Sequence, residues 1–208
     1  MYNYFADRRL IRTTASLATF MLASSLILTL AGVAPVDAAD ANASRSPDPR
    51  AIALIDQRGV PFALRDLRGG PVIVTFIATR CLDACPIANA LFARLRSRLD
   101  RDHMAATLLT LTLDPRYDTP VVMAREARLL AARVPGWRFA TGSPDAVRAL
   151  MRAFGVDVRP DRRGVPDVHT TFVYILDARS RLARTLLLST TFVDEAAEML
   201  RDPALRSG

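Results

Sequence analysis

Two runs of mainly apolar and β-branched residues constrain the fold of this chain most strongly. The run PVIVTFIA occupies residues 71–78, and the run ATLLTLTL occupies residues 106–113. Continuous runs of β-branched and aliphatic residues are typical of strands that are buried on both faces, as in a parallel sheet covered by helices. The sequence therefore predicts a sheet that lies between two layers of helices.

A helical pattern follows the first run. Ile87, Leu91, Leu95 and Leu99 recur at helical spacing with arginines between them, which predicts an amphipathic helix. The later elements are predicted from caps, turn residues and further apolar runs. They are a helix over about 120–133 capped by Thr119 or Asp118, a strand at 137–140, a helix from Ser143 to near Gly155, a polar loop at 158–169, a hairpin of strands at 170–177 and 181–189, and a last helix that starts at a Thr191–Asp194 capping box and ends near Arg201.

The order of these elements predicts an α/β fold. Strands alternate with helices and end in a hairpin, so we expect a parallel core, an antiparallel addition and helices on both faces. A thioredoxin-like three-layer sandwich with a mixed central sheet satisfies this order. We expect one such domain over residues 51–205, preceded by a linker rich in Ala, Ser, Asp and Pro at residues 42–50.

The N-terminal residues 1–41 have the pattern of an export signal or membrane anchor. Arg8, Arg9 and Arg12 precede an uncharged, largely apolar run at residues 13–36, and small residues follow it. The run is long enough to span a bilayer, so membrane association through it is an alternative to cleavage. Either outcome predicts that the domain lies in the periplasm or on the outer face of the inner membrane, where disulfides are permitted.

The basic composition does not indicate a nucleic-acid-binding protein. The formal net charge is +7, and all 28 basic residues are arginine. These arginines are dispersed through the chain, a distribution more typical of a biased genome composition than of a phosphate-binding surface. We therefore expect no nucleic-acid partner.

The segment TRCLDACP contains the only two cysteines of the chain, Cys81 and Cys85. As a structural disulfide, the pair would close a loop of about five residues and contribute about 2 kcal/mol, against about 4.7 kcal/mol for a 100-residue loop. The pair is thus a weak covalent staple. Thiol–disulfide exchange and metal binding are the stronger interpretations of this segment.

The position of the cysteines favours reactive sulfur atoms. Pro86 disfavours helical dihedral angles at Cys85, so we expect the helix to begin at about Pro86 and both cysteines to lie in the loop before it. A helix N-terminus and the adjacent Arg80 favour thiolates, whereas Asp83 opposes them. The sequence leaves the sign of the net pKa shift open.

A soft metal ion held by two thiolates usually gains an imidazole ligand, and the chain has two histidines. His103 lies in a polar turn before the second apolar run, away from the predicted site, so we expect it at the surface. His169 lies at the end of the predicted loop, directly before a strand. Its position alone makes it a candidate ligand and no more.

Four segments together resemble the Sco/SenC family of cytochrome oxidase assembly proteins. They are TFIATRCLDACP, LTLDPRYDTP, WRFATG and VHTTFVYILD, in the family's order and with similar separations. The Cys-x-x-x-Cys-Pro sequence, the downstream histidine and the Asp-Pro-x-x-Asp-Thr-Pro sequence are the specific parts of this resemblance, which covers about residues 51–201.

The resemblance implies an exported or membrane-tethered thioredoxin-like domain that binds copper. The implied ligands are Cys81, Cys85 and His169, and the implied partner is the copper-site subunit of a terminal oxidase or another copper protein. Two thiolates and one imidazole suit Cu(I), with Cu(II) as a further state, and leave room for a partner's ligand. Two departures indicate a divergent branch: Leu82 stands where a proline commonly follows the first cysteine, and Tyr117 stands where an arginine is common.

The leading hypothesis is therefore a metallochaperone without enzymatic turnover. The alternative is a thiol–disulfide oxidoreductase in which Cys81 and Cys85 form the redox pair and reduce a partner's cysteines before metal insertion. The four-residue spacing differs from the Cys-x-x-Cys of thioredoxin-type reductases, which ranks this alternative lower. Peroxidase chemistry lacks the expected residues before Cys81, and a zinc site with two cysteines and one histidine is chemically allowed.

Overall fold

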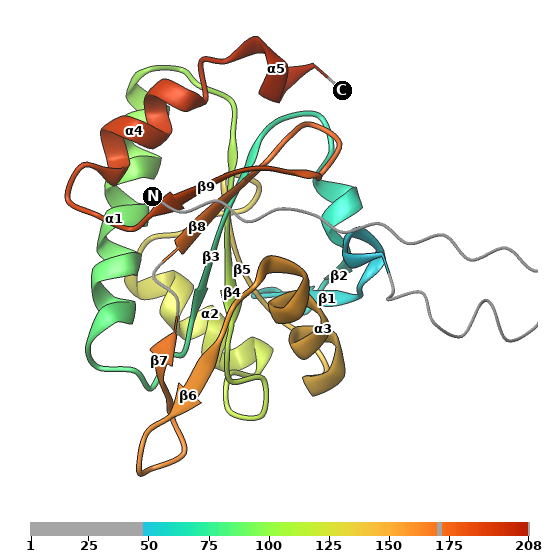
Figure 1. The fold of residues 1–208 in the computed structure, drawn as a ribbon, viewed down its shortest axis with the longest axis vertical. Coiled ribbons are helices and arrows are strands. Elements are labelled where there is room, and N and C mark those ends of the chain that lie inside the picture. The colour runs from blue at the N-terminus through green and yellow to red at the C-terminus, as the bar shows by residue number, and fades with distance from the viewer. Residues whose placement is uncertain (1–47, 170–171, 208) are drawn as a thin grey trace, which may run out of the picture. The chain divides into compact units, whose positions relative to one another are not determined.

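The structure is a computed structural model that describes residues 48–169 and 172–207 (Figure 1). The predicted export signal or anchor at residues 1–41 and most of the predicted linker lie outside the described residues. The last linker residues enter a short 3-10 helix, η2 (Pro49–Ala51). None of the helices in the described ranges is long and apolar enough to cross a membrane.

The described residues form a seven-stranded mixed sheet in the order β2-β1-β5-β4-β3-β8-β9 (Figure 1). Its centre is the parallel set predicted from the apolar runs, β3 (Val72–Ile77), β4 (Thr107–Thr112) and β5 (Trp137–Thr141). The predicted hairpin, β8 (Phe172–Leu176) and β9 (Leu182–Leu187), adds antiparallel to β3. The prediction of a mixed sheet is confirmed.

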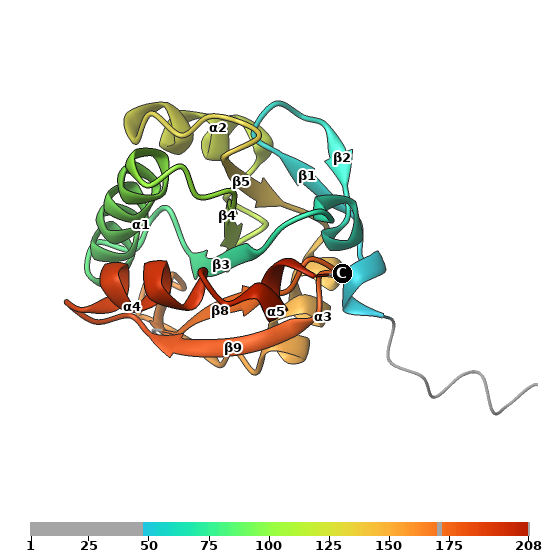
Figure 2. The same cartoon turned by 90° about the horizontal axis from the view of Figure 1, so that it is seen from above.

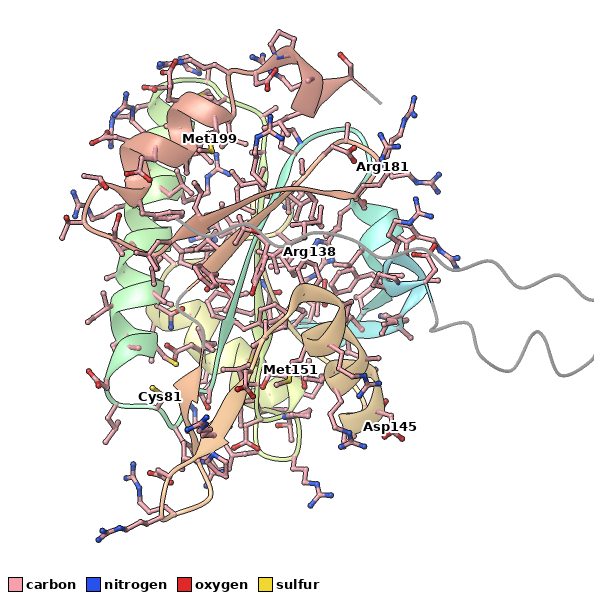
Figure 3. All side chains as sticks on the ribbon, in the orientation of Figure 1. Cys81, Arg138, Asp145, Met151, Arg181 and Met199 are labelled. Carbon is pink, nitrogen blue, oxygen red and sulfur yellow. The ribbon has the colours of Figure 1, made fainter. Side chains whose placement is uncertain are left out.

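Helices cover both faces of this sheet (Figure 2). α1 (Ala84–Arg101) and α2 (Pro120–Leu129) lie on one face, and α3 (Pro144–Phe154) lies on the other. α4 (Phe192–Met199) packs against α1 and is followed by the short α5 (Pro203–Arg206). The predicted three layers are therefore present, and Figure 3 shows Cys81 at the end of the sheet to which β3 leads.

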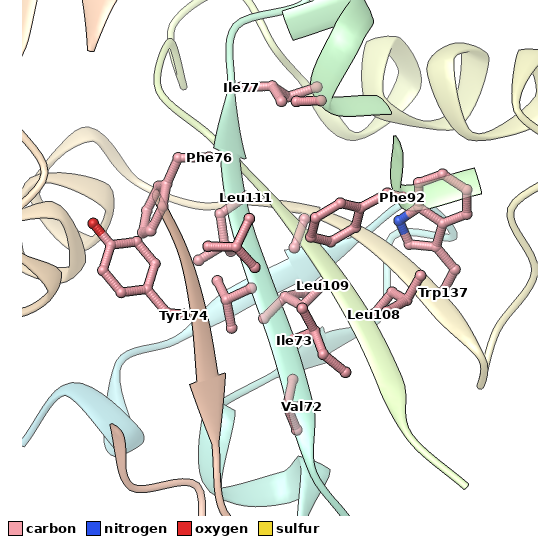
Figure 4. Close-up of a cluster of buried hydrophobic side chains, with 14 of the residues drawn as sticks. Val72, Ile73, Phe76, Ile77, Phe92, Leu108, Leu109, Leu111, Trp137 and Tyr174 are labelled. Carbon is pink, nitrogen blue, oxygen red and sulfur yellow. The ribbon is translucent and has the colours of Figure 1, made fainter. Parts of the chain in front are cut away.

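Aromatic side chains fill the core on both faces of β3 (Figure 4). On the α1 face, the ring of Phe92 lies 5.8 Å from that of Phe192 and 6.2 Å from that of Trp137. On the α3 face, the ring of Phe76 lies 5.6 Å from that of Phe154. All six residues of β3 are buried, as expected for a strand with a helical layer on each side.

Two hairpins of the structure were not predicted. β1 (Leu54–Asp56) pairs with β2 (Pro61–Phe62) at one edge of the sheet. β6 (Val158–Pro160) pairs with β7 (Pro166–His169), so the prediction of a polar loop in this region was wrong. The strands of both pairs are only two to four residues long. β6 and β7 lack an apolar run, whereas the apolar run AIALI at residues 51–55 was a signal for β1 that the prediction did not use.

One kind of turn closes the three hairpins found in the described ranges. The carboxylates of Asp56, Asp161 and Asp177 each accept N–H groups two and four residues later. The residue three positions after each aspartate has a positive φ, +80° at Gly59, +73° at Gly164 and +60° at Ser180. The near-identical segments DQRGV and DRRGV carry this signal in the sequence.

Three predictions about helices need correction here. The helix predicted over about 120–133 already ends at Leu129. Ile87 was assigned to the buried face of α1, yet its side chain is 57% exposed, because the buried face of the first turn is formed by Cys85, Ala88 and Asn89. The Thr191–Asp194 capping box is absent, since Thr191 has helical dihedral angles and its hydroxyl pairs with Glu195 instead. The caps Thr119 and Ser143 and the left-handed Gly155 are as predicted.

Candidate metal centre

Cys81 and Cys85 lie in the connection from β3 to α1 and are both buried, with 4% and 2% of their surface exposed. Neither forms a disulfide in the structure, and the two side chains are hydrogen-bonded to each other. The amide of Cys81 donates to the carbonyl of Ala78 at 3.0 Å, which turns the chain directly after the strand. The amide of Ala78 donates to Cys85 Sγ at 3.4 Å. The end of β3 therefore holds the second sulfur atom.

The helix begins earlier than the proline suggested. α1 starts at Ala84 with Asp83 as its N-cap, so Cys85 is already in the first turn and Pro86 follows it. The expectation that both cysteines precede the helix was therefore wrong for Cys85. The first-turn N–H groups have no intrahelical partner, so a proline is tolerated there and need not be the first helical residue.

Burial decides the protonation of Cys85. It raises the pKa of this thiol well above its usual range, and the hydrogen bond with Cys81 raises it further, although the Ala78 amide acts in the opposite direction. The helix N-terminus alone would favour the thiolate. Arg80 is paired elsewhere, because its guanidinium lies 2.5 Å from Asp114 and 4.4 Å above the ring of Tyr117. Cys85 is thus held in its thiol form in the apo protein.

The buried side chain of Asp118 forms hydrogen bonds with the segment just before the cysteines. It accepts the Thr79 amide at 3.3 Å, the Thr112 hydroxyl at 2.7 Å and the Thr79 hydroxyl. Burial raises the pKa of Asp118, because the carboxylate has no access to solvent. These bonds join the ends of β3 and β4. Sequence analysis treated Asp118 as a helix cap and as part of the Asp-Pro-x-x-Asp-Thr-Pro sequence. Its contact with Thr79 spans 39 positions of the chain and has no local signal in the sequence.

A pocket of about 160 Å³ opens beside the two sulfur atoms. Its polar wall is formed by Asn89 of α1 and Glu126 of α2, whose side chains are joined by a hydrogen bond of 2.9 Å. Burial raises the pKa of Glu126. The remaining lining residues are Ala78, Thr79, Pro86 and Leu130. This pocket provides a route by which a small ligand reaches both cysteines.

The two histidines occupy different ends of the fold. His103 is exposed after the last turn of α1, as predicted, and the 18 residues of α1 put it about 27 Å from the cysteines along the helix axis. His169 is the last residue of β7, and its backbone pairs with Val158. β8 begins three residues later and runs antiparallel to β3, so His169 is attached to the end of the sheet where β3 leads into Cys81.

The side chain of His169 lies outside the described part of the structure. Among the described residues, no group of three or more His, Cys, Asp or Glu side chains is arranged to hold a metal ion. The structure thus brings Cys81 and Cys85 together and places the His169 backbone at the same end of the sheet. The complete ligand set stays a prediction.

Relatives of this chain were found by sequence. Residues 46–202 match the sequence pattern of the SCO1/SenC family. A protein of Stutzerimonas stutzeri described as a putative copper-binding protein is 32% identical over 148 residues, which are 66% of this chain and 71% of that protein. The mitochondrial protein SCO2 of Saccharomyces cerevisiae is 29% identical over 140 residues, which are 64% of this chain but only 45% of the yeast protein.

Solved structures agree with the fold. A SCO1/SenC family lipoprotein from Bacillus anthracis superposes with a TM-score of 0.66 at 22% identity, covering 72% of this chain and 90% of that one. Copper-bound ScoI of Bradyrhizobium japonicum superposes with a TM-score of 0.62 at 24% identity, covering 72% and 95%. The predicted thioredoxin-like fold is confirmed by these neighbours and by the mixed sheet. From the family pattern over three quarters of its length and from this fold, the chain belongs to the SCO1/SenC family.

Proposed function

We propose that this protein is an exported copper-binding metallochaperone, which assists assembly of the copper centre of a terminal oxidase. Cys81, Cys85 and His169 are the proposed ligands. The observation that carries the proposal is the pair of buried cysteines, not joined by a disulfide, at the end of β3 beside a pocket. Family membership and the copper-bound structures of relatives support it.

The chemistry of the residues fits copper. Two thiolates are soft ligands, and an imidazole completes a set that suits Cu(I). Burial of both cysteines keeps competing water away from the sulfur atoms, while the pocket leaves one side accessible to a ligand from a partner. Copper would be passed by exchange of ligands, so the protein performs no enzymatic turnover. Because bound thiolates have lost their protons, loading releases the proton of the Cys85 thiol.

The first test is copper stoichiometry of the reduced, full-length protein. We expect one Cu(I) per chain. His169→Ala should weaken retention against a Cu(I) chelator by more than tenfold, and Cys81→Ser should abolish it, because metal sites lose affinity steeply with their ligands. His103→Ala is the matched control, since this histidine is exposed at the far end of α1. Equal retention by the wild type and His169→Ala would contradict the proposed ligand set.

The location and partner are tested in cells. Export predicts that an epitope-tagged chain is found outside the cytoplasm, in the periplasm or on the outer face of the inner membrane. Deletion of the gene should lower the activity of a copper-dependent terminal oxidase, and added copper should restore part of it. A tagged protein confined to the cytoplasm would contradict export without affecting the copper test.

A second function is favoured by the reduced state of the two neighbouring cysteines, which are not joined by a disulfide. As a thiol–disulfide oxidoreductase, the protein would transfer two electrons and two protons to a partner disulfide, leaving two partner thiols and a Cys81–Cys85 disulfide. This reaction requires both cysteines and does not require His169. Reduction of a partner disulfide that survives in His169→Ala but not in Cys85→Ser would identify it.

A further inference from the structure

A hollow of about 700 Å³ lies beside the amino end of β3, away from the cysteines. Five arginines line it, and we name them the arginine face: Arg50, Arg65, Arg68, Arg179 and Arg206. The other lining residues are Asp48, Gly69 and Ala178. The wall therefore contains five cations, one carboxylate and no aromatic side chain.

The charge of the arginine face is largely unbalanced. Arg50 pairs with Asp48 at 2.9 Å. Within the described ranges, the other four arginines form no ion pair, and all four are exposed. The guanidinium of Arg68 donates to the carbonyl of Arg65, and the guanidinium of Arg206 donates to that of Arg201. The acceptor in each bond is a neutral carbonyl, so neither bond cancels the positive charge of a guanidinium. This surface therefore attracts anions.

The tertiary structure builds this face from four separate segments, residues 48–50, 65–69, 178–179 and Arg206. The amide of Gly69, just before β3, donates to the carbonyl of Ala178 in the β8–β9 turn at 3.3 Å. The amide of Ala178 donates to the carbonyl of Leu205 in α5 at 2.9 Å. The buried hydroxyl of Ser180 donates to the carbonyl of Leu64 at 2.7 Å. Backbone bonds thus hold arginines from distant parts of the chain on one surface.

The chain enters the domain at this same face. Asp48 and Arg50 line the hollow, and the uncharged run at residues 13–36 lies only eleven residues before Asp48. Eleven extended residues reach at most about 40 Å. If the run is embedded in a bilayer, the arginine face is the part of the domain that is tethered nearest to the lipid headgroups.

We propose that the arginine face docks the domain on anionic phospholipid headgroups of the membrane. Each arginine near an anionic leaflet is attracted to it, and the attraction acts within a Debye length, about 8 Å at physiological salt. The open hollow presents several exposed guanidinium groups to a flat surface. It lacks the aromatic wall with which a nucleotide base would stack.

This docking sets the direction in which the proposed metal centre points. β3 runs from the arginine face to Cys81, and its six residues span about 20 Å. Figure 3 shows Cys81 and Arg181, which ends the β8–β9 turn, at opposite ends of the sheet. A domain seated on its arginines therefore presents its cysteines away from the bilayer. The docking itself does not depend on copper.

The test labels arginines of the full-length chain with phenylglyoxal in nanodiscs. One set contains phosphatidylcholine only, and the other contains phosphatidylglycerol and phosphatidylcholine in equal parts. We expect labelling of Arg65, Arg68 and Arg179 to fall about fivefold in the phosphatidylglycerol discs. The effect should disappear in 1 M salt, where the Debye length is about 3 Å. Arg162 and Arg163, exposed on the β6–β7 hairpin, are internal controls whose labelling should not change.

Variants and a free anion complete the test. Arg68→Gln with Arg179→Gln should remove the protection of Arg65, whereas Arg162→Gln with Arg163→Gln should leave it intact. Equal labelling in both lipids, failure of the chain to co-elute with the discs, or protection of the hairpin instead would overturn the proposal. Protection by inorganic phosphate in phosphatidylcholine discs at matched ionic strength would also overturn it, since it would identify a site for free anions.

Discussion

At the scale of single residues, the hydrogen bonds of buried threonines distinguish positions that otherwise look alike. Thr112 ends β4 and Thr141 ends β5, and both are buried. The Thr112 hydroxyl donates to Asp118 at 2.7 Å and accepts the amide of Asp114 at 2.8 Å. The Thr141 hydroxyl has no hydrogen-bond partner among the described residues. The two hydroxyls should therefore contribute with opposite sign to stability.

We predict that Thr112→Val lowers the free energy of unfolding by about 2 kcal/mol, because a buried carboxylate loses a partner. The matched variant Thr141→Val should be neutral or stabilising, because it removes an unpaired buried hydroxyl. Urea denaturation of the reduced apo protein measures both values. Equal destabilisation by the two variants would contradict the account of Asp118 as the group that fastens the ends of β3 and β4.

At the scale of elements, three hairpins use the same aspartate turn in different surroundings. The side chain of Asp56 is fully buried and lies 2.9 Å from Arg58 and 3.1 Å from Arg138. The side chain of Asp161 pairs with the exposed Arg163 alone, at 2.8 Å. Burial opposes ionisation of Asp56, but the amides of Val60 and Arg58 and the guanidinium of Arg58 lower its pKa on balance. The β1–β2 edge therefore depends on a buried charge.

We predict that Asp56→Asn destabilises the protein by about 3 kcal/mol, since it leaves Arg138 without its buried partner. Asp161→Asn keeps the turn and loses an exposed pair, so it should cost less than about 1 kcal/mol. The lowered pKa of Asp56 contributes stability above its usual value of 3.8, and this stability is lost as pH falls through the lower folded value. The free energy of unfolding, measured across this acid range, should therefore depend less on pH in Asp56→Asn than in the wild type. An equal pH dependence in the two proteins would contradict the buried ion pair.

At the scale of the whole molecule, the cysteines link metal binding to the stability of the core. Cys81 and Cys85 belong to the same buried cluster as β3 and α1. A ligand that binds only the folded state raises the free energy of unfolding by mass action, about 2.7 kcal/mol at a hundred times its dissociation constant. Copper binding at the two cysteines should therefore raise the free energy of global unfolding.

We predict that Cu(I) at this excess raises the melting temperature of the reduced protein. Oxidation of Cys81 and Cys85 to a disulfide should abolish the shift, because a disulfide cannot ligate copper. His169→Ala should reduce the shift, and His103→Ala should preserve it. Differential scanning calorimetry provides the measurement, and an equal shift for the reduced and oxidised forms would contradict ligation by the two thiols.

Local patterns determined most of the scaffold. The apolar runs predicted β3 and β4, and the caps Thr119, Ser143 and Gly155 predicted the bounds of helices, because these signals act between residues close in sequence. The cysteine pair was found from composition and spacing. The interpretation of His169 as a ligand came from the family resemblance, and it stays a prediction.

The tertiary structure decided what depends on burial and on distant partners. The raised pKa of Cys85 follows from its enclosure under β3 and α1, which no local pattern reports. Asp118 meets Thr79 across 39 positions of the chain, and the arginine face joins segments from both ends of the domain. Sequence by itself therefore determined the central strands, the main helices and the candidate sulfur ligands, but not the two short hairpins. Only the packing of the chain determined the protonation of Cys85, the hydrogen bonds of Asp118 and the arginine face. The reason is that burial and electrostatics depend on neighbours in space.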